Sequence, residues 1–158
     1  MSLLSTEICT EIDRWLEKYP PNQKQSAVIS ALHTVQNYHG WISRELLDAV
    51  AEYLEMPNIA VYEVASFYSM FDLKEVGRYK INICTNISCL LSGAEEMVEY
   101  IEKRLGIRVG QTTADGKFTL RSVECLAACV SAPVCEINRD YHERLTPDKI
   151  DAILKELE

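Results

Sequence analysis

Four of the six cysteines in this 158-residue chain form two closely spaced pairs. Four residues separate Cys84 from Cys89, and three separate Cys125 from Cys129. Cysteine thiolates are soft ligands that bind zinc or the irons of iron–sulfur clusters, and four of them complete either kind of site. If the two pairs converge in the fold, the sequence therefore predicts a four-thiolate metal centre.

The spacing of the pairs leaves the metal open. Structural zinc sites commonly use cysteines about two to four residues apart, whereas iron–sulfur clusters tolerate wider spacing because their ligands bind separate irons. The wide pairs slightly favour a cluster, as do the small and apolar residues 126–132, which let backbone N–H groups approach sulfur. Neither pair has the C-x-x-C spacing of a thioredoxin-type dithiol.

The remaining cysteines and the histidines are interpreted as ordinary structural residues. Cys9 and Cys135 lie within apolar stretches, where a free cysteine behaves as a small hydrophobic residue. His33, His39 and His142 have no metal-ligand spacing among themselves. With no secretory signal at the N-terminus, we expect a reducing compartment and no disulfide framework.

Residues 1–76 show the apolar periodicity of four short helices. The first carries its apolar face over 8–16 and ends before Pro20-Pro21, and the second begins near Val28 and stops at Gly40. Ser43 is the expected N-cap of the third helix, and Pro57 the expected first turn of the fourth. Such helices should pack as a bundle.

Residues 77–158 alternate between strand and helix patterns. Strands are predicted at 79–84, 107–109, 117–123 and 133–138. Helices are predicted at 94–105 and from Pro147 onward. Ser92 and Glu95 form a capping box for the first of them, but that helix could also begin near Ser88. The fold class is therefore α+β, a helical bundle followed by a mixed sheet with two covering helices. Since each cysteine pair follows a predicted strand, both pairs could meet at one end of this sheet.

Composition excludes several classes of function. The net charge is −8, with −6 in residues 1–76 and −2 in residues 77–158, which disfavours binding to nucleic acid or anionic lipid. No apolar run approaches the roughly 18 residues of a membrane-spanning helix. The chain has no G-x-G-x-x-G or P-loop motif, so no nucleotide site is recognisable.

Three runs of sequence resemble a known family. They are HGWISRELLDAVAEYLEMPNIAVYEVASFYSMF, FYSMFDLKEVGRYKINICTNISCLLSGAEEM and ECLAACVSAPVCEIN. Over about residues 23–150 the chain resembles the thioredoxin-like [2Fe–2S] ferredoxin subunit of NADH:quinone oxidoreductase, respiratory complex I. The resemblance implies a helical part at 1–76, a thioredoxin-like cluster-binding domain at 77–158 and one [2Fe–2S] cluster. It assigns the cluster ligands to Cys84, Cys89, Cys125 and Cys129. Cys135 departs from the pattern, since an aliphatic residue is expected there.

The same resemblance implies an electron-transfer role. The cluster would exchange one electron with FMN on a partner subunit that also binds NADH, so the chain is not expected to be catalytic in isolation. Such a subunit would lie in the cytoplasm, peripheral to the inner membrane as part of a complex. Related subunits occur in NAD(P)-linked hydrogenases and formate dehydrogenases, which leaves the complex open. A zinc-stapled interaction module is the alternative from a different class.

Overall fold

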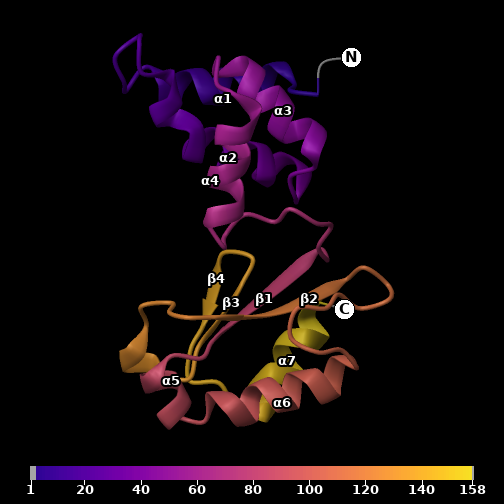
Figure 1. Ribbon diagram of the computed structural model, residues 1–158. Coiled ribbons are helices and arrows are strands. Elements are labelled where there is room, and N and C mark those ends of the chain that lie inside the picture. Colours follow the sequence, from indigo (N-terminus) through magenta and orange to yellow (C-terminus); the bar gives the residue numbers. More distant parts are fainter. Residues whose placement is uncertain (1–2, 158) are drawn as a thin grey trace. The chain divides into compact units, whose positions relative to one another are not determined.

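The computed structural model describes residues 3–157 of the chain (Figure 1). These residues divide into two compact units, with the boundary between Glu75 and Val76. Each unit has its own buried apolar cluster.

The first unit is entirely helical (Figure 1). Its elements are α1 (Thr6–Leu16), the short 3-10 turn η1 (Lys24–Ala27), α2 (Val28–His39), α3 (Arg44–Tyr53) and α4 (Asn58–Phe67). The Ser43 hydroxyl accepts the N–H of Leu46 at 3.3 Å, so this serine is the predicted N-cap. Helix α2 ends at Gly40, whose φ of 83° is a conformation that glycine adopts without steric cost.

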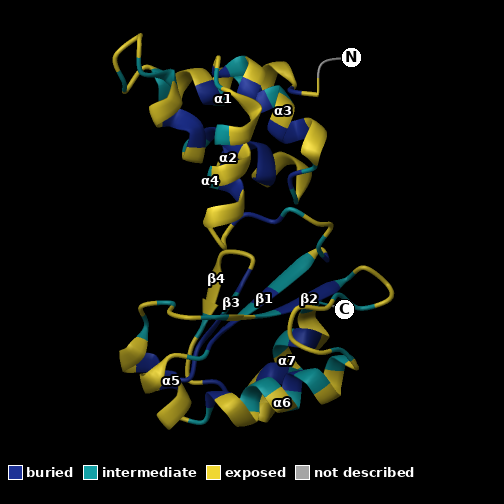
Figure 2. Ribbon diagram, viewed as in Figure 1, coloured by how far each residue is buried: buried dark blue, intermediate teal, exposed yellow. Residues whose placement is uncertain are grey.

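One apolar side chain from each long helix marks the centre of this unit. Ile12 of α1, Leu32 of α2, Val50 of α3 and Val61 of α4 are all fully buried in one cluster. Figure 2 shows the buried residues along the helix faces that turn toward one another, with exposed residues on the outer faces. The four amphipathic patterns read from the sequence therefore describe one shared core, as expected for a bundle.

The second unit is built on a four-stranded mixed sheet in the order β2-β1-β3-β4 (Figure 1). Its strands are β1 (Tyr79–Cys84), β2 (Phe118–Val123), β3 (Cys135–Ile137) and β4 (Asp140–His142). Strands β1 and β2 are parallel, with Cys84 opposite Val123 in the register. Strand β3 pairs antiparallel with β1, and β4 pairs antiparallel with β3.

Two long helices cover one face of this sheet (Figure 1). They are α6 (Ala94–Leu105) and α7 (Pro147–Leu157). Their Ile101, Ile150 and Leu154 are buried in one cluster with Ile81 of β1 and Leu120 of β2. The predicted α+β class, with a helical bundle followed by a mixed sheet and two covering helices, is therefore confirmed.

Some elements of this unit differ from the predictions. Residues 107–109 form no strand, because the end of α6 holds them: the N–H of Ile107 donates to the Glu102 carbonyl, and the N–H of Val109 donates to the Glu102 carboxylate. The predicted capping box is also wrong. Helix α6 begins after Gly93, at φ 91°, and the Ser92 hydroxyl donates instead to the carbonyl of Ser88.

Two further differences concern the chain on either side of β3. The strand begins at Cys135, two residues later than predicted, since Pro133 has no N–H to donate to a ladder. The chain then turns back through Asn138, at φ 56°, into β4, which was not predicted. A strand of three residues is too short to show alternation in the sequence.

Candidate metal centre

The fold brings both cysteine pairs to one end of the sheet. Cys84 is the last residue of β1, and Cys125 follows the end of β2 by two residues. Because β1 and β2 are parallel and in register, the segments that follow them leave the sheet at the same end. Cys89 lies in the short helix α5 (Ile87–Leu91), and Cys129 begins the 3-10 turn η2 (Cys129–Ser131).

The two pairs differ in their exposure. Cys84 and Cys89 are buried in a small apolar cluster with Ala94 and Val134. Leu126, Ala128 and Ala132, all from the segment around the second pair, pack against this cluster. Cys125 and Cys129 are exposed. The site therefore has a buried side made by the first pair and a solvent-facing side made by the second.

Backbone N–H groups are directed at three of the four sulfurs. Burial raises the pKa of the Cys84 thiol, but N–H groups of Asn86 and Leu126 and the neighbouring Cys89 thiol outweigh it, so that the pKa lies below its ordinary value. The N–H of Ala127 donates to the sulfur of Cys125 at 3.2 Å. These donors favour a thiolate, which is the form of cysteine that binds metal.

The pKa of Cys89 is shifted in the opposite direction from that of Cys84. Burial, followed by its interaction with Cys84, raises the pKa of Cys89 to about 11, although the N–H of Val134 acts against this. The charge of Cys129 also reaches Cys89 and raises the pKa further. Two thiolates held this close repel each other, and a bound cation removes that repulsion.

The donor set, four thiols in two pairs, fits a two-iron cluster, since each iron takes two thiolates. Within residues 3–157, no group of three or more cysteine, histidine or carboxylate side chains is placed to hold one metal ion. A structural zinc ion needs four ligands around one point, whereas each iron of a [2Fe–2S] cluster takes only two. Two cysteine pairs at one end of the sheet, with N–H groups directed at three of the sulfurs, suit the second requirement.

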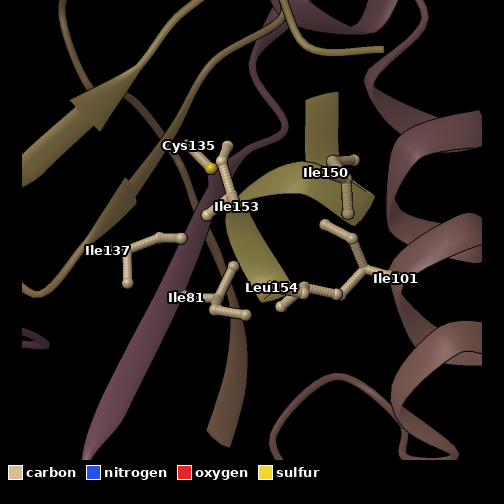
Figure 3. A pocket seen from close by; sticks show the side chains of 7 residues that line it. All are labelled: Ile81, Ile101, Cys135, Ile137, Ile150, Ile153 and Leu154. Atoms are coloured by element: carbon tan, nitrogen blue, oxygen red, sulfur yellow. The ribbon is translucent and has the colours of Figure 1, made fainter. Parts of the chain in front are cut away.

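The other two cysteines lie elsewhere. Cys9 is half-buried beside the core of the helical unit. Cys135 is buried on β3, and its side chain lies among Ile81, Ile153 and the other aliphatic residues that line a small cavity under α7 (Figure 3). Burial raises the pKa of Cys135 to about 12. Both cysteines therefore lie in apolar surroundings, as predicted.

Several features of the site could not be identified by searching for metal ligands. The N–H donors of Asn86, Leu126 and Val134 are backbone groups, so the amino-acid types at these positions do not predict them. A weaker signal is present in the charge pattern, because residues 84–93 and 126–135 contain no charged side chain in a chain that is 25% charged. Uncharged loops around cysteines are typical of segments that pack on a buried or partner-covered centre.

Comparison with known proteins identifies the family. A family model described as thioredoxin-like [2Fe–2S] ferredoxin matches residues 12–158. An NADH-quinone oxidoreductase subunit of Rickettsia felis is 47% identical over 142 residues, which cover 89% of this chain and 85% of the relative. The corresponding subunit of Rhizobium meliloti NADH-quinone oxidoreductase is 41% identical over 145 residues, covering 92% and 85%.

A solved structure shows the same fold at lower sequence identity. The air-oxidised NAD+-reducing [NiFe]-hydrogenase matches with a TM-score of 0.75 and 22% sequence identity, over 88% of this chain and 24% of that chain. This chain thus spans about a quarter of the hydrogenase chain. The family model and the relatives agree over nearly the whole sequence, and the family description names the [2Fe–2S] cluster that the two cysteine pairs fit. The chain belongs to the thioredoxin-like [2Fe–2S] ferredoxin family.

Proposed function

We propose that this chain is the [2Fe–2S] electron-transfer subunit of an NADH:quinone oxidoreductase, with Cys84, Cys89, Cys125 and Cys129 as the cluster ligands. The observation that carries this proposal is the meeting of two cysteine pairs at one end of the sheet, in a chain of this family. Cys84 and Cys89 lie in one buried cluster, so we assign them to one iron and the exposed pair to the other.

When bound, the cluster supplies one-electron redox chemistry. The residues of the chain hold and shield it. Four thiolates give an oxidised cluster a net charge of −2, and the reduced form carries −3. N–H groups of Asn86, Leu126, Ala127 and Val134 would offset this charge. The apolar packing of Ala94 and Val134 excludes water from the buried side.

The partner that we propose is a subunit carrying FMN and the NADH site. Exposed apolar side chains support a docking surface beside the cysteines: Val130 is 94% exposed, Leu91 82% and Ile87 71%. Large apolar side chains that gather in solvent commonly mark protein interfaces. Cys125 and Cys129 are exposed, and Val130 directly follows Cys129 in η2, so a partner covering Val130 would approach the cluster closely.

Similarity to the relatives supports a quinone-linked complex. Relatives with that name are 41% to 47% identical, whereas the hydrogenase is 22% identical and shares the fold alone. No helix within residues 3–157 has the length and apolar character needed to cross a membrane. In line with the relatives, we propose a peripheral position in the complex, on the cytoplasmic side of the inner membrane.

Iron and acid-labile sulfide analysis of the purified protein tests the cofactor. We expect about two iron and two sulfide per chain and no stoichiometric zinc. One zinc per chain without sulfide would contradict the cluster and support the interaction module instead. Purification of the native chain from its source tests the partner, since a flavin-containing subunit should co-purify with it. Co-purification with hydrogenase or formate dehydrogenase subunits would overturn the assignment to a quinone-linked complex.

A further inference from the structure

Ala127, between the cysteines of the second pair, has an uncommon backbone conformation. Its φ is 57°, in the left-handed region. For a residue with a Cβ this region is sterically unfavourable, and asparagine, aspartate and glycine are the usual occupants. Alanine has no polar side-chain atom that could compensate locally. The surrounding structure must therefore hold Ala127 in this conformation, and such residues concentrate at functional sites.

The consequence of this conformation is visible in the hydrogen bonds of the loop. The N–H of Ala127 donates to the sulfur of Cys125 at 3.2 Å. The left-handed backbone at Ala127 thus accompanies an amide that is directed at a proposed cluster ligand.

We propose that Ala127 is a positioning residue for the cluster: its left-handed backbone directs its own N–H group at the sulfur of Cys125 and thereby raises the reduction potential. This inference rests on the proposed function, since it requires the cluster at these cysteines. The N–H dipole of Ala127 at the Cys125 sulfur would offset part of the cluster charge. Such dipoles stabilise the −3 reduced form more than the −2 oxidised form.

The direct test replaces the N–H of Ala127 by an ester oxygen, by incorporating L-lactic acid at position 127 in the full-length protein. This change keeps the methyl side chain, removes the donor and weakens the Leu126 carbonyl as the acceptor of the Tyr141 hydroxyl, so Tyr141→Phe serves as the control for the second effect. In an EPR-monitored redox titration we expect the reduction equilibrium to become about tenfold less favourable, a shift of about 59 mV to lower potential for one electron. An unchanged potential in the ester protein would overturn the proposal.

Two side-chain variants separate positioning from stability. Ala127→Gly keeps the N–H and adopts a positive φ freely, so its potential should equal that of the wild type while its thermal stability equals or exceeds it. Ala127→Val places a β-branched residue in the same conformation, and its potential should fall in the direction of the ester. A role in folding alone predicts a loss of stability in Ala127→Val with an unchanged potential, which would contradict positioning.

Glu55→Val is the matched control for strain. Glu55 has a φ of 56°, but it lies after α3 in the helical unit and pairs with Lys24. This variant should lower stability and leave the potential unchanged. A wild-type protein that binds no iron or sulfide would refute the proposed function itself, whereas a normal cluster with equal potentials in all the variants would refute only the role of Ala127.

Discussion

The cysteines of this chain differ in what surrounds their sulfur atoms. Cys84, Cys89 and Cys125 each accept a backbone N–H, and Cys129 acts electrostatically on Cys89. Cys135, in contrast, lies among aliphatic side chains, and burial dominates its titration. Proximity in sequence therefore does not identify the proposed ligands, since Cys135 is only six residues from Cys129. Three of the four proposed ligands thus have a backbone N–H at the sulfur, whereas Cys135 has aliphatic side chains around it.

Substitution of individual cysteines should separate these two classes. Replacing Cys84, Cys89, Cys125 or Cys129 by alanine leaves one iron without a ligand, so we expect loss of most bound iron and of the visible absorption. Cys9→Ser and Cys135→Ser should keep the native spectrum. Iron content and visible spectra of the six proteins check this. Loss of the cluster in Cys135→Ser together with its retention in Cys129→Ala would show that the ligand set is wrong.

Cys135 should also make stability depend on alkaline pH. Its pKa is about 12 in the folded chain, against an ordinary value of 9.0. Between these values the unfolded chain releases the thiol proton and the folded chain keeps it, so the free energy of unfolding falls as pH rises from about 9 toward 12. Below the ordinary value this contribution to stability is fully present. Urea unfolding of wild type and Cys135→Val at neutral and alkaline pH measures the difference.

The expected result is a smaller alkaline loss of stability in Cys135→Val than in the wild type. Valine is suited to the site, because the cavity beside Cys135 has a volume of about 10 Å³ and is lined by aliphatic residues (Figure 3). At neutral pH the variant should therefore be at least as stable as the wild type. Parallel pH profiles for the two proteins would show that Cys135 ionises equally in both states.

Among the elements, the N-terminal ends of α1 and α3 are each capped by a serine side chain. Ser43 caps α3 through its hydroxyl, and Ser5 caps α1 in the same way, by accepting the N–H of Ile8. Ser43→Ala should lower the free energy of unfolding by about 1 kcal/mol, because the N–H of Leu46 loses its acceptor. Ser66→Ala is the control, since Ser66 is an exposed serine within α4 whose hydroxyl bonds only to a carbonyl of its own helix. Thermal or urea unfolding that shows equal effects for the two variants would contradict the capping role.

Sequence was sufficient where residue type restricts the backbone. Gly40 and Gly106 end the helices at the predicted positions, and period-2 alternation located β1 at Tyr79–Cys84. The sequence was insufficient where tertiary contacts decide which element a segment forms. Residues 107–109 have the composition of a strand, but Glu102 ties them to the end of α6. The meeting of the cysteine pairs could be foreseen from two strands that end before them, whereas the left-handed Ala127 could not, because alanine carries no preference for that conformation.

At the scale of the whole molecule, the two units differ in charge and in content. The helical unit carries −6 of the net charge of −8, and all four proposed ligands lie in the second unit. The second unit also has a core of its own, formed by the sheet with α6 and α7. We propose that residues 77–158 form the cluster-binding domain and that residues 1–76 contribute mainly to association with the partner.

Separate expression of the second unit tests this division. A fragment that begins at about residue 76 should assemble the cluster and give the EPR signal of the full chain after reduction. Its affinity for the flavin subunit should be lower than that of the full chain, because it lacks the helical unit. The full-length protein serves as the control in both measurements. A fragment that folds but takes up no iron would show that the helical unit is needed for the centre.

The last prediction is that NADH will not reduce the purified chain. NADH donates a hydride, which carries two electrons, whereas a [2Fe–2S] cluster ordinarily accepts one. Flavin is the usual cofactor that divides such a pair, and the sequence contains no recognisable nucleotide motif. Dithionite, a direct reductant, should bleach the visible spectrum, and NADH alone should leave it unchanged.

Addition of the flavin subunit should then make NADH effective, to an extent set by the reduction potential. The ester protein at position 127 connects this experiment with the site, because a lower potential should reduce the fraction of cluster that NADH reduces while dithionite still reduces all of it. Flavin content must be measured in the isolated chain, since a trace of the partner would imitate direct reduction. Rapid bleaching by NADH in flavin-free protein would mean that this chain has a nicotinamide site of its own, and that it is more than an electron carrier.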